Sequence, residues 1–311
     1  MKFFLKIGSY ILLCIYSGQI YTSQDNYKDT QESLDNRALE YCKLHKNLYI
    51  TIVWPRAIEH LDQIQEGLSA LGSIIYTKQL ILKNNGPHIF LQHINEKSKK
   101  PDHHYNLHFN YDIQIKEFPI GIILLQSDKK IEEIRVIKDA VRDQVGMDKR
   151  SFHIDDTPEG TLETAQMVFV KNSIDFMNHA QPKKLKWFNK QLDKYREWLC
   201  KNKVNFDDFC LAGDAVLVAY GITEGKDLGY LHHGHEHMRE ATIYVNSHNT
   251  VIKKNTDIVI DDIIFNPDNF FYYKGLKFAS LERVKRIKEQ RNREKDIIDL
   301  NYIQQFMESY K

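Results

Sequence analysis

The first third of the chain combines short apolar runs with stretches in which apolar residues recur at helical spacing. Residues 49–54 form an apolar run that predicts a strand, and Pro55 ends it. Apolar residues then recur every three or four positions from 58 to 71, and 74–82 again has the pattern of a strand. A helix is expected over 31–44.

The next segments continue this order up to about residue 180. The composition of residues 84–87, Asn-Asn-Gly-Pro, is typical of a turn. Residues 119–126 predict a buried strand, and a helix follows with Ile131, Ile134, Ile137 and Val141 on one side. The order of strands and helices predicts an α/β sandwich domain over residues 24–180.

The second half of the chain has a different character. Two periodic stretches, 161–177 and 184–200, predict a helical bridge. Beyond residue 206 come a glycine turn, short strand patterns at Tyr230, 241–245 and 258–265, and two terminal helices. We therefore expect an α/β (α+β) protein, whose second domain, 181–311, is a mixed sheet with helices.

The chain begins with positive charge and a short apolar run. Lys2 and Lys6 precede about 15 apolar residues, whereas roughly 20 are needed to span a bilayer. This pattern predicts a secretory signal over 1–23 and a location in the secretory lumen, the periplasm or the extracellular space. A short retained anchor, the only expected contact with a membrane, and a buried helix remain alternatives.

The three cysteines beyond this segment are Cys42, Cys200 and Cys210. An odd number cannot complete an intramolecular disulfide framework. A bridge between Cys200 and Cys210 is conceivable in an exported chain, but three ordinary thiols are favoured slightly.

Composition and charge exclude several classes of protein. Apolar residues make up 42% of the chain, which excludes a disordered protein. Lysine and arginine number 43 against 42 aspartates and glutamates, so no general basic field exists for nucleic acid. Acidic partners would need a local basic patch.

The segment 211–230 carries the most informative pattern. Gly213 and Asp214 open an apolar helix pattern, and twelve residues separate Asp214 from Asp227, which precedes a strand. A glycine at a helix start lets the backbone approach phosphates. Two carboxylates two residues apart on a strand would share divalent cations with those phosphates.

This segment resembles the nucleotidyltransferase superfold, and the resemblance covers about 206–305. It implies that Gly213 and Asp214 lie at the phosphates and that Asp227 binds Mg²⁺ or Mn²⁺ as the first strand carboxylate. Asp261 or Asp262 would supply a further carboxylate. Two residues depart from the family pattern: Asp214 replaces a hydroxyl residue, and Gly229 stands where the second strand carboxylate is expected.

The residues downstream look like those of sugar- and capsule-associated members of this superfold. The segment 262–278 is similar to theirs, and Lys288, Arg291, Lys295, Asp296 and Asp299 match a Lys…Arg…Lys-Asp..Asp tail. Lys226, Lys274 and Lys277 are further residues predicted to bind nucleotide phosphates. The alternative for the basic segment is a solvated helix face with Glu282, Glu289 and Glu294 at pairing distance.

A dense histidine tract follows Asp227. His233, His235 and His237 would lie on one face of a strand and, with Glu236 nearby, could bind zinc, nickel or copper. On a loop these histidines would simply be solvated, and that is the more frequent arrangement.

A second, fainter resemblance links the first half to nucleoside-diphosphate kinases. It rests on Pro55 after the first strand, and on His153 and Asp156 in the segment 151–157. It implies that His153 carries a phosphoryl group. The alternative is the N-terminus of a helix with acidic residues in its first turn.

These patterns leave two main hypotheses about function. One is metal-dependent transfer of a nucleotidyl or phospho-polyol group from a nucleotide-activated donor to a glycan or phosphorylated acceptor. The other is a binding or interaction module on the same fold that has lost catalysis, which Gly229 favours. A phosphohistidine phosphotransferase acting through His153 is the third.

Overall fold

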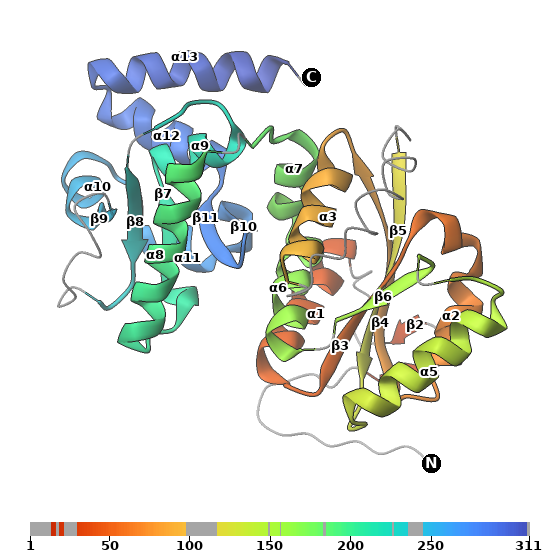
Figure 1. Ribbon diagram of the computed structural model, residues 1–311. Coiled ribbons are helices and arrows are strands. Elements are labelled where there is room, and N and C mark those ends of the chain that lie inside the picture. The colour runs from red at the N-terminus through yellow and green to blue at the C-terminus, as the bar shows by residue number, and fades with distance from the viewer. Residues whose placement is uncertain are drawn as a thin grey trace. The chain divides into compact units, whose positions relative to one another are not determined.

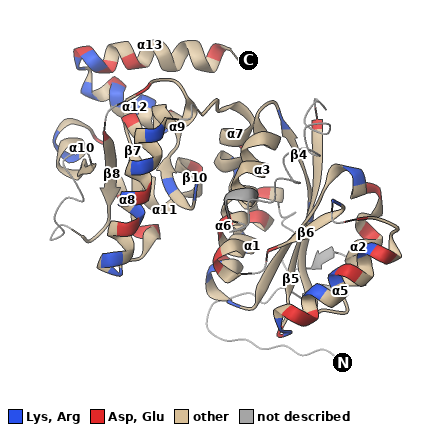
Figure 2. Ribbon diagram, in the orientation of Figure 1, with Lys and Arg blue, Asp and Glu red and all other residues tan. Residues whose placement is uncertain are grey.

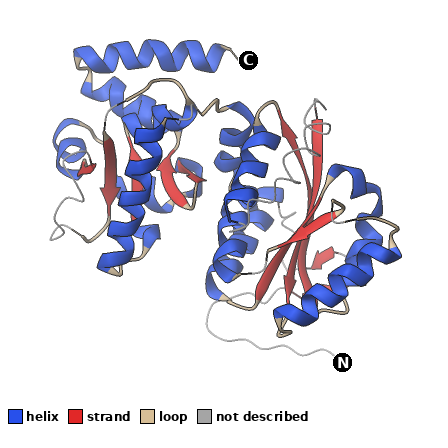
Figure 3. Cartoon of the chain, viewed as in Figure 1, coloured by secondary structure: helices blue, strands red, loops and turns tan. Residues whose placement is uncertain are grey.

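The computed structural model describes residues 14–16, 19–21, 30–97, 117–148, 150–155, 157–182, 185–225, 227–235 and 245–309. The chain splits into two compact units (Figure 1). Unit 1 comprises residues 1–81 and 103–165, and unit 2 comprises 82–102 and 166–311. Each unit has helices packed on its own sheet (Figure 3), so the predicted α+β class is confirmed.

Unit 1 is built around the four-stranded sheet β4-β5-β3-β6. Its elements are α1 (Gln31–Leu44), β3 (Leu48–Val53), the 3-10 helix η1 (Pro55–His60), α2 (Leu61–Leu68), β4 (Ser73–Lys83), β5 (Glu117–Gln126), α5 (Ile131–Gln144), β6 (Phe152–Ile154) and α6 (Pro158–Phe169). The helix expected over 31–44 and the strands near 49–54, 74–82 and 119–126 are confirmed.

The strand order of unit 1 is that of a split β-α-β arrangement. The central strand β3 pairs antiparallel with both β5 and β6, so that Ile52 lies opposite Ile122 on one side and His153 on the other. Helix α2 links β3 to β4, and α5 links β5 to β6. Such β-α-β-β-α-β folds carry many unrelated functions, so this topology does not identify one.

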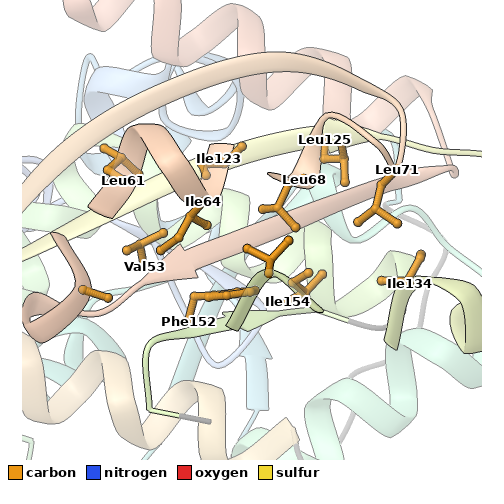
Figure 4. Close-up of a cluster of buried hydrophobic side chains, with 12 residues drawn as sticks. Val53, Leu61, Ile64, Leu68, Leu71, Ile123, Leu125, Ile134, Phe152 and Ile154 are labelled. Carbon is orange, nitrogen blue, oxygen red and sulfur yellow. The ribbon is translucent and has the colours of Figure 1, made fainter. Parts of the chain in front are cut away.

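Helices α2 and α5 cover one face of this sheet and form a hydrophobic core with it (Figures 1 and 4). Ile64 and Leu68 of α2 point toward Ile123 of β5 and Phe152 of β6, and all four side chains are fully buried. Removing apolar surface from water is the main favourable contribution to folding. The apolar residues at helical spacing on α2 and the alternate residues of the strands therefore pack together in one layer between the helices and the sheet.

Helix α1 is tied to the edge strand β4 by a buried polar cluster. The Nζ of Lys78 lies 2.7 Å from an Asp35 carboxylate oxygen, and the Tyr76 hydroxyl donates to the other Asp35 oxygen at 2.8 Å. Burial lowers the pKa of Lys78, although the charge of Asp35 opposes that shift. These contacts fix α1 on the sheet.

Unit 2 is built around the five-stranded mixed sheet β10-β11-β7-β8-β9. Its helices are α3 (Gly86–Lys97), α7 (Lys171–His179), α8 (Lys186–Asn202), α9 (Asp214–Tyr220), α10 (Asn249–Asn255), α11 (Ile260–Phe265), α12 (Leu281–Arg291), α13 (Glu294–Glu308) and the 3-10 helices η3 (Phe206–Asp208) and η4 (Pro267–Asn269). Its strands are β7 (Phe209–Ala212), β8 (Leu228–His232), β9 (Val245–Ser247), β10 (Phe270–Tyr273) and β11 (Leu276–Ala279).

Unit 2 includes segments that the sequence analysis assigned to the first domain. The backbone N–H of Tyr272 donates to Ser173 Oγ at 2.9 Å, which joins α7 to β10. The backbone N–H of Lys83 donates to Asn178 Oδ1 at 2.8 Å, which joins the start of the 82–102 segment to α7. Residues 82–102 and 166–180 therefore belong with the second sheet.

Three local predictions are wrong. Residues 84 and 85 form a turn, but Gly86 begins α3, a helix that the Gly-Pro pair concealed. The periodic stretch 161–177 is interrupted at Val170, between α6 and α7. The strand expected over 258–265 is replaced by α11, because Ile260, Ile263 and Ile264 are buried at helical spacing.

The terminal segment and the cysteines complete the description. Most of the predicted signal lies outside the described residues; within it, β1 (Cys14–Tyr16) and β2 (Gln19–Tyr21) pair antiparallel. No helix in the described parts of the chain is both long and apolar enough to cross a membrane. Cys42, Cys200 and Cys210 are free thiols, and burial raises the pKa of Cys42 and of Cys210 to about 12.

The core of unit 1 generates a prediction about stability. Replacing the fully buried Leu68 by alanine leaves a cavity, so the free energy of unfolding should fall by about 2–5 kcal/mol. The matched control Leu44→Ala changes a side chain in a residue that is 69% exposed and should cost less than about 0.5 kcal/mol. Urea unfolding measures both; equal costs would contradict this assignment of the core.

Candidate functional site

The glycine turn and the helix predicted from residue 213 are present in unit 2, and a strand leads into them. Strand β7 ends at Ala212, and α9 begins at Asp214. Between them Gly213 has φ +64° and ψ −130°, a backbone conformation that residues other than glycine rarely adopt. Glycine at this position lets the chain turn sharply from the strand into the helix.

Asp227 and Gly229 lie at the same end of the sheet as this turn. Asp227 is exposed and directly precedes β8, and Gly229 is the second residue of that strand. Gly229 pairs with Ala212 on β7 and with Asn246 on β9. The pairing therefore places Asp227 and Gly229 beside the start of α9.

The imidazole of His248 lies where a side chain at position 229 would project. A Cβ on Gly229 would approach His248 Cε1 to 2.1 Å and its Nδ1 to 2.4 Å, and a Cβ on Gly213 would lie 3.6 Å from the same ring. The backbone N–H of His248 donates to Tyr230 O at 2.8 Å, which holds the residue at the end of β9. The ring therefore fills the space in which a side chain at position 229, where the resemblance expects a second carboxylate, would project.

The surroundings of His248 favour its neutral form. Burial is the main cause of its lowered pKa, and the positive charge of Arg291 adds to it. The charges of Asp214 and Asp227 act in the opposite direction without reversing the shift. At neutral pH the imidazole therefore has one N–H donor and one acceptor nitrogen.

Asp214, at the start of α9, is held by two lysines. Its Oδ1 lies 3.3 Å from the Nζ of Lys288, and its Oδ2 accepts a hydrogen bond from Lys295. Burial by itself would raise the pKa of Asp214, but the hydrogen bond from Lys295 and the charge of Lys288 outweigh it and lower the pKa. The Asp214 carboxylate is therefore ionised, and the two lysines balance its charge.

Lys288 is the centre of a buried network that joins α12 and α13. Both helices carry positively and negatively charged residues (Figure 2). The Nζ of Lys288 donates to Asp299 Oδ2 at 2.6 Å and lies 3.7 Å from Asp296 Oδ1. Asp296 also accepts hydrogen bonds from Arg291 and, at 2.8 Å, from Arg293 Nε. Burial raises the pKa of Asp296, but these two arginines lower it to about 2.

The two carboxylates proposed as further ligands lie at the other end of β8. Asp261 Oδ1 contacts His233 Nδ1 at 2.9 Å, and His233 follows the last residue of β8, whereas Asp227 precedes its first. Six residues of extended chain correspond to about 20 Å. Asp262 accepts from Arg283 at 2.8 Å and from Asn266 at 3.1 Å.

The structure therefore does not bring Asp227 together with Asp261 or Asp262. Within the described parts of the chain, no group of three or more histidine, cysteine, aspartate or glutamate side chains is placed to hold a metal ion. The donor set at position 229, a glycine faced by a neutral imidazole, lacks the paired oxygens that Mg²⁺ requires. These residues do not fit the two-metal site that the resemblance implies.

Residues 233–235 of the histidine tract lie beyond strand β8 and are not part of a strand. Strand β8 ends at His232, and Gly234 has φ +70°. His235 Nε2 lies 3.2 Å from Asp208 Oδ2, and its ring stacks on Phe209 with centroids 4.8 Å apart. His237 lies outside the described residues.

The remaining predicted residues are dispersed. Lys277 is buried, and its Nζ donates to Asp207 O and Ile264 O at 2.8 Å each, so its ammonium is used within the fold. Lys274 lies in the turn between β10 and β11 with φ +53°. Lys226 lies outside the described residues, and His153 lies on β6 of unit 1, where its Nε2 is 3.3 Å from Asp155 Oδ1.

His248 was not predicted from the sequence. It stands alone in a Ser-His-Asn context, far along the chain from Gly229, and no spacing rule links the two. The only available signal was Gly229 itself, because a glycine inside a strand often marks the close approach of another group.

The contact between His248 and Gly229 yields a second prediction. Gly229→Ala should lower the free energy of unfolding of unit 2, because the new methyl group must displace the ring. His248→Ala should relieve this conflict, so that the double variant is less destabilised than the sum of the two single variants by about 1 kcal/mol or more. Urea unfolding of the four proteins measures the coupling; strict additivity would show that the ring does not occupy this space.

Comparison of the chain with protein-family models, with curated proteins and with solved structures finds no match in any of the three.

Proposed function

We propose that unit 2 is a nucleotidyltransferase-like module that binds a nucleotide or a nucleotide-activated donor without carrying out two-metal transfer. The observation that carries this proposal is the His248 ring in front of Gly229. A group that excludes the second carboxylate also excludes the metal pair on which the family chemistry depends.

The local architecture supports the relation to nucleotidyltransferases. A strand leads through Gly213 into α9, and an antiparallel neighbour, β8, follows Asp227. Helices α12 and α13 carry the Lys…Arg…Lys-Asp..Asp pattern and contact the start of α9 through Lys288 and Lys295. Gly213, Asp214 and the residues of this tail therefore lie in one region of unit 2, whereas Asp261 and Asp262 lie away from it.

The charges in this region favour binding over catalysis. Lys288 and Lys295 pair with Asp214, and Arg291 and Arg293 pair with Asp296. Cations already matched by carboxylates give no strong field for the four negative charges of a metal-free triphosphate. A ligand with fewer charges suits the site better, such as the nucleotide part or monophosphate end of a donor used in glycan or surface-polymer assembly.

The proposal predicts that nucleotide binding is independent of metal. A thermal-shift panel on the full chain would use the monophosphates CMP, UMP, AMP and GMP beside CTP, UTP, ATP, GTP and CDP, each with and without Mg²⁺ or Mn²⁺. A nucleotide at a hundredfold its dissociation constant should stabilise the protein by about 2.7 kcal/mol. We expect at least one nucleotide to raise the melting temperature equally with and without metal.

A reconstructed variant provides the matched control. Gly229→Asp combined with His248→Ala restores the second carboxylate and removes the ring that fills its space, so metal should now increase the shift. A metal-dependent shift in the unaltered protein that is lost in Asp227→Ala would overturn the proposal in favour of a transferase. Absence of any nucleotide shift would contradict nucleotide binding altogether.

A further inference from the structure

A polar cavity lies at one end of the sheet of unit 1. Its volume is about 640 Å³, within the range of about 300–1,000 Å³ that is usual for small-molecule sites, and it is open to solvent. Its walls come from the residue before β3, the start of β4, the end of β5, and the loop and first turn that begin α5. All the lining residues belong to unit 1, so the cavity shares none with the site around Gly213.

Backbone contacts hold the walls of this cavity in place. Gly72 passes the end of β5 so closely that a Cβ on it would lie 2.0 Å from Gln126 O, an approach that requires glycine. Ser127 is buried, and its backbone N–H donates to Asn47 O at 3.0 Å while its Oγ donates to Leu71 O at 2.7 Å. A site that is already rigid loses little conformational freedom when a ligand binds.

A chain of hydrogen bonds orients the side chains along one wall. The Tyr41 hydroxyl donates to Gln126 Oε1 at 3.0 Å, and Gln126 Nε2 donates to Asn47 Oδ1 at 3.3 Å. Asn47 Nδ2 in turn donates to Asp128 Oδ1 at 2.7 Å, so the chain ends on an exposed carboxylate. Asp128 Oδ2 accepts no hydrogen bond from another described residue, which leaves it available to a ligand donor.

The charges of the lining disfavour an ionic ligand. Lys129 Nζ lies 3.9 Å from Glu133 Oε1, a long contact that leaves the partly exposed ammonium able to donate to a ligand. An anion would be repelled by the carboxylates of Asp128 and Glu133, and a cation would be repelled by Lys129. No aromatic side chain is among the described residues that line the cavity, so a nucleotide base would have no ring on which to stack.

We propose that this cavity binds a neutral, hydroxyl-rich ligand, either a sugar or an open-chain sugar alcohol. A hydroxyl group both donates and accepts hydrogen bonds. Neighbouring hydroxyls of one ligand can therefore donate to Asp128 Oδ2 and accept from Lys129 Nζ, with Ser73 as a further polar group of the wall. This inference goes beyond the proposed function, because it concerns unit 1 and a ligand without phosphate or base.

The test is calorimetric titration of the full chain with glucose, N-acetylglucosamine, maltose and ribitol. All four carry neighbouring hydroxyls, and their relative affinities tell a sugar from an open-chain polyol. We expect saturable binding of at least one of them. Asp128→Ala removes an acceptor at the end of the hydrogen-bond chain, so it should weaken binding by about tenfold or more. Ser73→Trp places an indole in the cavity and should abolish binding.

Asp143→Ala is the matched control on α5. Asp143 is exposed, does not line the cavity, and lies about 15 Å along the helix from Glu133, so binding should be unchanged. Absence of saturable binding in the unaltered protein, or full affinity in Asp128→Ala, would overturn the inference. If Ser73→Trp does not fold, Asp128→Ala decides the question, because Asp128 is exposed.

Failure of this inference differs from failure of the proposed function. A nucleotide shift that persists in Asp128→Ala, without binding of any of the four polyhydroxyl compounds, overturns the cavity site alone. Binding of one of these compounds that depends on Asp128, without any nucleotide shift, overturns nucleotide binding alone. Sugar binding that is lost in His248→Ala and kept in Asp128→Ala would assign the ligand to unit 2 and contradict the inference.

Discussion

The buried ammonium of Lys288 is the interaction on which the arrangement of unit 2 depends. It extends from α12 and contacts Asp214 at the start of α9 and Asp296 and Asp299 on α13. The lysine side chain and Asp296 are almost completely removed from water. A buried ion pair adds little compared with apolar packing, but removing one partner leaves uncompensated charge, which is strongly destabilising.

This network changes the interpretation of the charged tail. From the sequence alone, its lysines, arginines and aspartates are predicted to bind a substrate. In the fold they mostly pair with one another, and Asp214, which the resemblance would place at the phosphates, is part of the same set. The proposal of a nucleotidyltransferase-like module without two-metal chemistry rests on this pairing and on the His248 ring in front of Gly229.

The sequence predicted well what depends on local pattern. The helix over 31–44, the strands near 49–54, 74–82 and 119–126, and the glycine before α9 follow from apolar spacing and from the conformational freedom of glycine. The prediction failed at α11, where β-branched residues suggested a strand although Ile260, Ile263 and Ile264 have helical spacing. Consequently Asp261 and Asp262 lie in the first turn of a helix, where their negative charge interacts favourably with the helix dipole.

The arrangement of the site depends on contacts that no local pattern encodes. From the sequence, Gly229 indicated that the second carboxylate of the resemblance is absent. It did not indicate that the His248 ring occupies that space. Lys288, Asp296 and Asp299 could be recognised as a motif, whereas their pairing with Asp214 requires α12 and α9 to be adjacent. Which charges face a ligand and which face one another is decided only by the tertiary structure.

The most direct measurement is the free energy of unfolding of Lys288→Met, compared with Lys285→Met on the same helix. Lys285 pairs with Glu289 at 3.7 Å, and its side chain is 26% exposed. If Lys288 holds the fold together, its replacement should cost about 3–5 kcal/mol and that of Lys285 less than about 1 kcal/mol. Equal, small costs would show that Lys288 is free for a ligand and would contradict the account.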